Sequence, residues 1–167
     1  RAKDAIENAE KIITTDTLFK RLDISDAKIS LCQISQIAEE ILECQSDNIA
    51  VLVSGDVNFY SLSKTIKINL EKLALKSEEA ADEKLKFQLE DIELEFINGI
   101  SSMQYFFAKI KKNYDDVKIA SAHGRNTDMV ALSSYNKKVF ALTGGEQKAQ
   151  IICQRLTSAG LGNVAVT

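Results

Sequence analysis

The stretch Val51-Leu52-Val53-Ser54-Gly55-Asp56-Val57-Asn58-Phe59-Tyr60 joins an apolar run to a small residue, a glycine and a charged residue. Residues 48–53 are a continuous run rich in β-branched side chains, which is typical of a strand covered on both faces. In open α/β sheets, ligands bind beyond the carboxyl ends of the strands. The stretch therefore predicts a ligand loop or, alternatively, a tight turn before a helix that starts near Phe59.

Strand and helix patterns alternate along most of the chain, which predicts an α/β fold with a largely parallel sheet. Further strands are expected at 11–15, 92–97, 117–120 and 138–142, and residues 163–167 resemble a strand cut short. Helices are expected at 1–6, at 34–42, from Ser101 or Ser102 to 108, and from 146 to about 159. Residues 71–91 are rich in Glu, Lys, Leu and Ala and lack glycine, which predicts an exposed helical extension or helix-turn-helix.

Composition bounds the class of protein. The chain has 167 residues, of which 45% are hydrophobic and 27% charged, which is typical of a globular protein with one medium or two small domains. No apolar run approaches the roughly 20 residues of a membrane helix, and no signal peptide is visible. The net charge of −3 gives no indication of nucleic-acid binding. Because the sequence begins with Arg1 inside a helical pattern, we expect the true N-terminus to lie upstream.

The cysteines and the phosphate motifs exclude several kinds of site. Cys32, Cys44 and Cys153 are far apart and form no C-x-x-C pair, so they are expected to be buried free thiols in a reducing cytoplasm. No G-x-x-x-x-G-K-[ST] stretch is present. The G-x-G-x-x-A match at 160–165 follows a helix instead of a strand, so we expect Gly160 to be a helix C-cap.

Four glycine-containing loops are each expected directly after a strand. They are Ser54–Asp56, Asn98–Ser102, Ser121–Arg125 and Thr143–Gly145. Glycine allows backbone to approach a ligand closely, and free N–H groups at helix starts bind polar ligand atoms. Any one of these loops is more often an ordinary turn, but four at strand ends favour a pocket.

Three polar residues in these loops are candidates for chemistry. His123 is the single histidine, so a histidine metal cluster cannot form from this chain without an outside ligand, and a hydrogen-bonded structural imidazole is the simpler role. Arg125 suits planar recognition of carboxylates, or is a surface arginine in a turn. Asp56 either caps the next helix or contacts a ligand.

The loops, taken together and in this order, resemble a known family. Four segments are similar to the S-G-D-P…F-Y, P-G-I-S-S, S-x-H-G-R and Leu-Thr segments of the cobalt-precorrin-7 C5-methyltransferases, a branch of the tetrapyrrole methylase family. In the same order, these segments are Val53–Ser61, Asn98–Tyr105, Ser121–Arg125 and Leu142-Thr143. The chain departs from this pattern at both motif prolines, replaced by Val57 and Asn98, which is expected to loosen two loops. The family's Gly-x-Gly-Pro-Gly loop is also absent.

The resemblance implies a fold, a reaction and a site. It implies two α/β domains, residues 1–113 with a mostly parallel sheet that lacks its first strand, and residues 114–167 with a mixed, truncated sheet. S-adenosyl-L-methionine would lie between them and leave as S-adenosyl-L-homocysteine after methyl transfer to ring carbon C5 of a corrinoid, without a metal. The implied cofactor contacts are Gly55, Asp56, Phe59, Ser101, Ser102, Leu142 and Thr143. Arg125 would hold substrate carboxylates, and His123 would act as the base.

The same resemblance implies a cytoplasmic homodimer that binds neither nucleic acid nor membrane. Two alternatives stay open. The chain could be another tetrapyrrole methylase, such as a uroporphyrinogen or diphthamide-pathway methylase, which an assay of methyl acceptors would distinguish. It could also be a non-catalytic α/β binding module that kept the sheet and lost the glycine-rich loop.

Overall fold

The computed structural model describes residues 1–21 and 28–167, which fall into two compact units, Arg1–Ser102 and Met103–Thr167. Both units contain parallel strands and helices, so the α/β class is confirmed. Each unit is described by itself below. The units divide at residue 102, and the domain boundary predicted after residue 113 stays a prediction.

The first unit is built on a parallel sheet of three strands in the order β2-β1-β3. They are β1 (Lys11–Thr14), β2 (Ile29–Leu31) and β3 (Ile49–Val51). The central strand β1 is the buried one, because Ile12, Ile13 and Thr14 are at most 2% exposed. β3 is a shorter, half-buried edge strand, so it is less enclosed than the pattern at 48–53 predicted.

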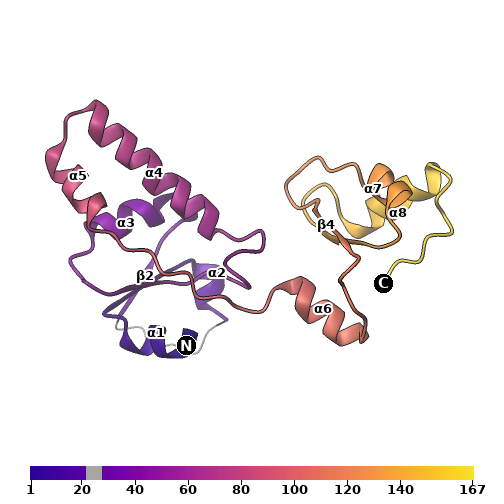
Figure 1. Ribbon diagram of the computed structural model, residues 1–167, viewed down its shortest axis with the longest axis horizontal. Helices are drawn as coiled ribbons and strands as arrows, with labels where there is room; N and C mark the ends of the chain where they lie inside the picture. The colour runs from indigo at the N-terminus through magenta and orange to yellow at the C-terminus, as the bar shows by residue number, and fades with distance from the viewer. Residues whose placement is uncertain (22–27) are drawn as a thin grey trace. The chain divides into compact units, whose positions relative to one another are not determined.

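Helices cover the sheet of this unit. They are α1 (Ala2–Asn8), α2 (Asp16–Phe19), the 3-10 turn η2 (Ile34–Gln36), α3 (Ile37–Glu43), α4 (Ser63–Glu79) and α5 (Glu83–Glu90). Figure 1 shows α3 and α4 on one side of the sheet and α1 on the other. The buried cluster on the α3–α4 side consists of Ile13, Ile37, Ala38, Ile66 and Leu70. This core fixes β1 and its neighbours, and with them the loop that follows β3.

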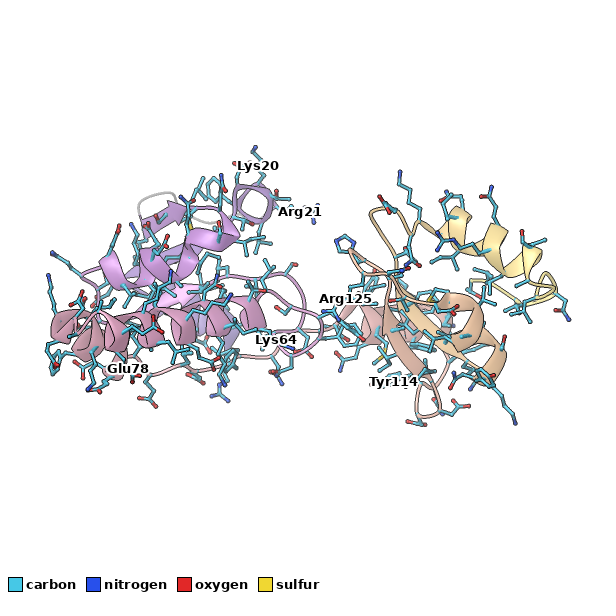
Figure 2. The ribbon with its side chains drawn as sticks, turned by 90° about the horizontal axis from the view of Figure 1, so that it is seen from above. Lys20, Arg21, Lys64, Glu78, Tyr114 and Arg125 are labelled. Carbon is cyan, nitrogen blue, oxygen red and sulfur yellow. The ribbon has the colours of Figure 1, made fainter. Side chains whose placement is uncertain are left out.

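The glycine-free segment 71–91 forms the predicted helix-turn-helix, consisting of the second half of α4 followed by α5. Lys64 and Glu78 mark the two ends of α4 in Figure 2. The N-terminal turn of α5 is capped by Asp82, whose Oδ1 accepts a hydrogen bond from the Leu85 N–H at 3.0 Å. The helices are not a purely solvated excursion, because Ser77 is buried and Leu73 and Leu89 pack against the core.

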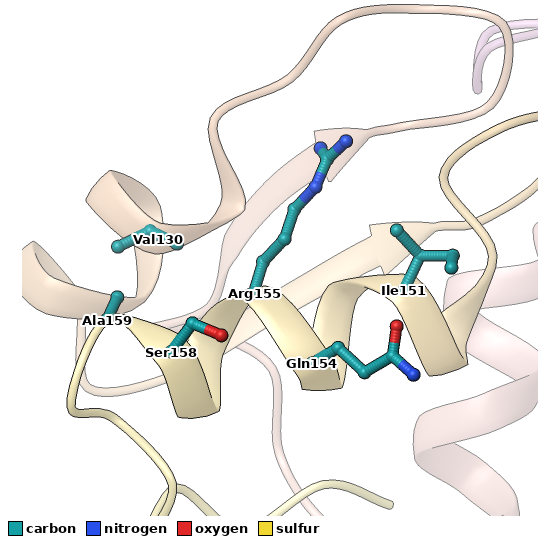
Figure 3. Close-up of a pocket in the computed structure, with 6 residues that line it drawn as sticks. All are labelled: Val130, Ile151, Gln154, Arg155, Ser158 and Ala159. Carbon is teal, nitrogen blue, oxygen red and sulfur yellow. The ribbon is translucent and has the colours of Figure 1, made fainter.

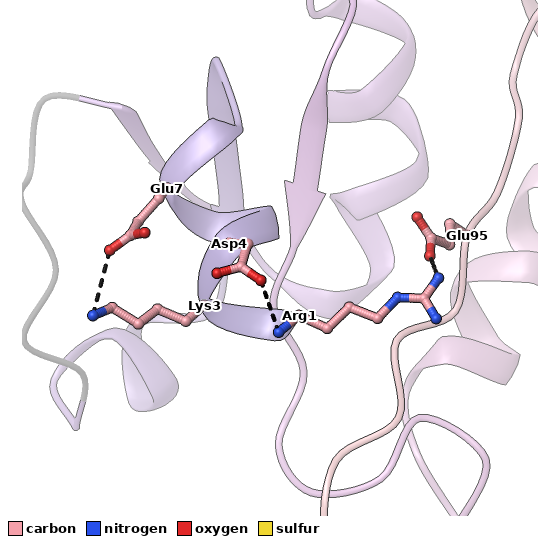
Figure 4. A network of polar contacts seen from close by, with 5 residues as sticks. All are labelled: Arg1, Lys3, Asp4, Glu7 and Glu95. Atoms are coloured by element: carbon pink, nitrogen blue, oxygen red, sulfur yellow. Dashed lines mark hydrogen bonds and ion pairs between the residues drawn. The ribbon is translucent and has the colours of Figure 1, made fainter.

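Residues 92–97 form no strand, so that prediction is wrong. Their alternation of apolar and acidic residues suits a strand, but a strand also needs a neighbour that completes its hydrogen-bond ladder. Here the chain is extended and open, with Leu94 and Phe96 each 44% exposed. Glu95 pairs with the guanidinium of Arg1, beside exposed ion pairs at the start of α1 (Figure 4). Exposed pairs of this kind add little to stability.

The second unit contains β4 (Lys118–Ser121) and β5 (Val139–Leu142), which pair in parallel, as predicted for 117–120 and 138–142. Three helices accompany them, α6 (Ser102–Ile110), α7 (Met129–Tyr135) and α8 (Ala149–Ser158). The buried cluster consists of Ala122, Met129, Ile152 and Leu156. Within the described part of this unit, the expected mixed sheet is not found, and residues 163–167 form no strand.

The end of α8 confirms the predicted glycine cap. Gly160 has φ +79°, a conformation that glycine adopts without a Cβ penalty. Its N–H donates to the Thr157 carbonyl at 3.0 Å, and the Leu161 N–H donates to the Leu156 carbonyl at 2.8 Å. This is the Schellman arrangement that ends a helix. The G-x-G-x-x-A match is therefore a helix end.

An exposed ion pair lies just before strands β4 and β5 and adds little to the stability of the unit. Lys138 Nζ lies 2.8 Å from Asp116 Oδ1, and this hydrogen bond holds the pKa of Asp116 below its usual 3.8. Because the folded pKa is lowered, the contact stabilises the fold above about pH 4 and is lost as the pH falls through the lowered value. In a carboxyl ¹³C NMR titration, Lys138→Met should raise the pKa of Asp116, whereas Lys148→Met should leave it unchanged. An identical pKa in wild type and Lys138→Met would contradict this assignment.

Candidate functional site

The loop after β3 is a tight turn built by Asp56. Gly55 has φ +77°, which favours glycine. The Asp56 carboxylate Oδ1 accepts a hydrogen bond from the Asn58 N–H at 2.8 Å, and the Asp56 carbonyl accepts one from the Phe59 N–H at 3.1 Å. Asp56 therefore closes an Asx turn. The alternative that it caps the next helix is wrong, because α4 starts at Ser63.

The second loop, at Asn98 and Gly99, lies directly against this turn. A Cβ atom placed on Gly99 would stand 2.2 Å from the Gly55 carbonyl oxygen, far inside van der Waals contact. The two backbones therefore meet at a point where only glycine fits. The structure brings together two loops that the sequence separates by more than forty residues.

Hydrogen bonds hold both positions at which the family pattern has proline. Asn58 Nδ2 donates to Asn98 Oδ1 at 2.8 Å, which links the two loops through their side chains. The Ser63 hydroxyl donates to the carbonyl of Val57. The loosening expected from the missing prolines is therefore offset by side-chain contacts that the sequence pattern did not indicate.

The other predicted cofactor residues of the first unit flank this pair of loops. The half-buried ring of Phe59 meets Tyr60 edge-on, with centroids 5.1 Å apart. Tyr60 has φ +49°, a left-handed backbone conformation that precedes the start of α4. Ser101 is 2% exposed, and Ser102 is the exposed first residue of α6. Gly55 is exposed and Asp56 is half-buried.

The two loops of the second unit also lie together, at the carboxyl ends of β4 and β5. The Ala122 N–H donates to the Leu142 carbonyl at 2.7 Å, which continues the ladder beyond the strands. The Thr127 hydroxyl donates to the Ser121 carbonyl at 2.6 Å and closes the first loop. Leu142 is half-buried and Thr143 exposed. Two predicted cofactor residues thus follow the strand beside the histidine loop.

His123 and Arg125 are both exposed. The imidazole of His123 lies directly against the backbone of Gly144. A Cβ atom on Gly144 would stand 2.0 Å from His123 Nδ1. Next to it, a Cβ atom on Gly145 would lie 3.8 Å from the Gly124 nitrogen. Gly144 therefore lets His123 lie directly against the Thr143–Gly145 loop, whereas a Cβ atom on Gly145 would make only an ordinary contact.

Gln147 is a site residue that sequence reasoning missed. Its side chain is part of a residue only 5% exposed, and its Nε2 donates to the Arg125 carbonyl at 2.8 Å. Its backbone N–H and carbonyl exchange 3.1 Å hydrogen bonds with Gly144. Its Oε1 is buried without a partner among the residues that the structure describes. A glutamine in a polar loop carries no sequence signal, so only the fold reveals it.

Two surface hollows lie away from these loops. One, of about 510 Å³, is lined by Val130 of α7 and by residues on and just after α8, as Figure 3 shows. The other, of about 450 Å³, lies where the exposed ring of Phe87 meets residues 41–51 and 91–94. None of the residues that line either hollow belongs to the four loops.

Residues 1–21 and 28–167 contain no group of three His, Cys, Asp or Glu side chains placed to hold a metal ion. In the same residues, no helix has both the length and the apolar character needed to cross a membrane. The three cysteines are free and half-buried, less enclosed than expected. Burial, followed by the charge of Glu40, raises the pKa of the Cys32 thiol.

Comparison with known proteins supports the resemblance carried by the loops. No family model matches the chain, and no solved structure matches it significantly. The chain is 27% identical over 161 residues to a protein of Methanocaldococcus jannaschii named "Probable cobalt-precorrin-7 C(5)-methyltransferase", a match that covers 91% of the chain and 68% of that relative. This similarity supports a relationship between the chain and the tetrapyrrole methylase family.

Proposed function

We propose that the chain catalyses S-adenosylmethionine-dependent methyl transfer to ring carbon C5 of a cobalt-precorrin in cobalamin biosynthesis. The observation that carries the proposal is that the four loops form two pairs at glycines, with Gly99 close to the Gly55 backbone and Gly144 close to the His123 side chain. The similarity to the archaeal relative adds independent support for this reaction class. A cytoplasmic homodimer is part of the same proposal.

The chemistry of the Asp56 turn fits a polar, partly cationic ligand. Because Asp56 Oδ1 is committed to the Asn58 N–H, the turn is rigid, and Oδ2 has no partner within the described part of the chain. A fixed carboxylate oxygen accepts hydrogen bonds from ribose hydroxyls or an ammonium group. Gly55, Phe59, Ser101 and Ser102 complete the proposed cofactor contacts of the first unit, and Leu142 and Thr143 supply those of the second.

The sulfonium of bound S-adenosylmethionine supplies a methyl group with a good leaving group, so no metal is needed in the proposed reaction. The chain's own residues then have three tasks, to hold the acceptor carbon in line, to exclude water and to remove a proton from the ring. His123 is the proposed base. Its Nδ1 is the ring nitrogen that lies against Gly144, so Nε2 is the nitrogen proposed to accept the proton.

The charge of the second unit fits an anionic acceptor. Lysines and arginines outnumber aspartates and glutamates in Met103–Thr167, although the whole chain has a net charge of −3. A corrinoid bears many carboxylates, and guanidinium groups bind carboxylates through two parallel hydrogen bonds. Arg125, in the loop with His123, is the proposed contact (Figure 2).

Substitution of Asp56 tests the cofactor half of the site. Asp56→Ala removes both the Asx turn and the free carboxylate oxygen, so we expect S-adenosylhomocysteine affinity to fall about tenfold or more, the effect of losing a charge-assisted hydrogen bond. Asp56→Asn keeps an oxygen for the Asn58 N–H but loses the charge, and should give a smaller loss. Isothermal titration calorimetry measures both.

The result that removes Asp56 from the site is an unchanged affinity in Asp56→Ala. Asp47→Ala is the matched control, because Asp47 precedes β3 at the opposite end of the strand. An assay with labelled S-adenosylmethionine and a panel of tetrapyrroles then identifies the acceptor. Methylation of uroporphyrinogen instead of a precorrin would favour another branch of the family.

A further inference from the structure

We infer that Gln147 is a positioning residue that sets the place of His123 by tying the histidine loop to the Thr143–Gly145 loop. Gln147 links the two loops through both its side chain and its backbone. Its side chain reaches the Arg125 carbonyl, and its backbone pairs with Gly144 in both directions. The His123 ring in turn lies directly against Gly144.

The orientation of the Gln147 amide follows from its partner. A carbonyl oxygen only accepts hydrogen bonds, so the amide atom 2.8 Å from the Arg125 carbonyl must be the donor Nε2. This leaves Oε1 as the buried atom without a partner in residues 1–21 and 28–167. The opposite assignment would place two acceptors in contact. The side chain is therefore held by one hydrogen bond, directed at the histidine loop.

The unpartnered Oε1 of Gln147 is evidence that this residue is not there only to stabilise the fold. A buried acceptor without a hydrogen bond lowers the stability of the folded state, so an apolar side chain of the same shape would suit the fold equally well or better. The Arg125 carbonyl also accepts a hydrogen bond from the Thr127 N–H at 3.1 Å, so it keeps a partner when the amide is removed. The one feature that requires glutamine here is the link to the loop that carries His123.

The link acts on the imidazole through the backbone. The residue pair Gly144 and Gln147 forms an antiparallel bridge, so the position of one fixes the other. The Nε2 bond then fixes the Arg125 carbonyl relative to that bridge, two residues after His123. Without it, the histidine loop keeps its attachments at Ala122 and Thr127 and the 3.1 Å bond from the Thr127 N–H to the Arg125 carbonyl, but it loses the Gln147 link to the Thr143–Gly145 loop.

The test uses the fact that His123 is the single histidine, so its imidazole NMR signals need no assignment by comparison. Gln147→Met and Gln147→Leu keep the volume and remove the amide. We expect both variants to shift or broaden the imidazole signals and to keep the wild-type thermal midpoint or raise it. Gln150→Met, the same change at an exposed position of α8, should leave the signals unchanged.

A second measurement rests on the proposed function. The Gln147 variants should bind S-adenosylhomocysteine about threefold to tenfold more weakly, the effect of one neutral hydrogen bond. If the wild-type chain does not bind it at all, the proposed function fails, while the imidazole signals still test Gln147. Unchanged imidazole signals in both variants would overturn the inference. So would unfolding of both variants, because Gln147 would then be part of the structural core.

Discussion

Gly99→Ala is expected to lower the free energy of unfolding by about 1–3 kcal/mol, the range for an extra group forced into a packed site. It should also weaken S-adenosylhomocysteine binding about tenfold or more. The reason is that the new Cβ would stand 2.2 Å from the Gly55 carbonyl, and a backbone atom cannot rotate away as a side chain can. The Ser54–Asp56 turn must therefore move away from Asn98. Urea unfolding followed by circular dichroism, together with calorimetric titration, measures both effects.

Gly162→Ala is the matched control for this substitution. A Cβ on Gly162 would meet Thr157 Cγ2 at 3.5 Å, an ordinary contact, and Gly162 has no positive φ. We expect its stability to stay the same or to rise slightly, because alanine restricts the unfolded chain. If Gly99→Ala behaves like this control in both measurements, the two loops are not in contact in solution.

Ile13→Ala is expected to lower the free energy of unfolding by about 2–5 kcal/mol, as large-to-small changes in a core do. Ile13 is 0% exposed on the central strand β1, and it packs with Ile37, Ala38, Ile66 and Leu70. A loss of this size is a large part of the stability of a typical domain. Urea unfolding measures it, and partial unfolding at 37 °C would appear as a reduced helical signal.

A graded series checks that burial causes this effect. Ile13→Val removes one methylene and should cost about 0.5–1.5 kcal/mol. Ile68→Ala makes the same change as Ile13→Ala at a position 37% exposed on α4, and it should cost clearly less. Equal losses at positions 13 and 68 would contradict the assignment of β1 as the centre of the core.

Much of the fold follows from local sequence pattern, and each failure has an identifiable physical cause. Strands β4 and β5 were predicted from their apolar runs, and they form because each has the other as a pairing partner. Residues 92–97 carry an equally good alternating pattern, yet they form no strand, because pattern alone does not supply a pairing partner. The start of α4 was misplaced because Asp56 and the positive φ of Tyr60 build a turn there.

The candidate site was predictable at the level of loops and not at the level of contacts. Glycine beside polar residues marked all four loops, although the loop at Asn98–Ser102 follows no strand in the structure. The bond from Asn58 to Asn98 joins residues forty positions apart, so no local pattern reveals it. Gln147 gave no signal, because its importance comes from burial, which the polar stretch around it does not indicate.

The most direct test of the central claim is calorimetric titration of S-adenosylhomocysteine into the protein, with NAD and ATP as controls. The proposed function predicts selective one-to-one binding that Asp56→Ala weakens. Absence of binding to the folded protein, or equal binding of ATP, would contradict it. The Ser54–Asp56 loop would then be a turn that holds Gly99 and Asn98 in place without serving a methyl donor.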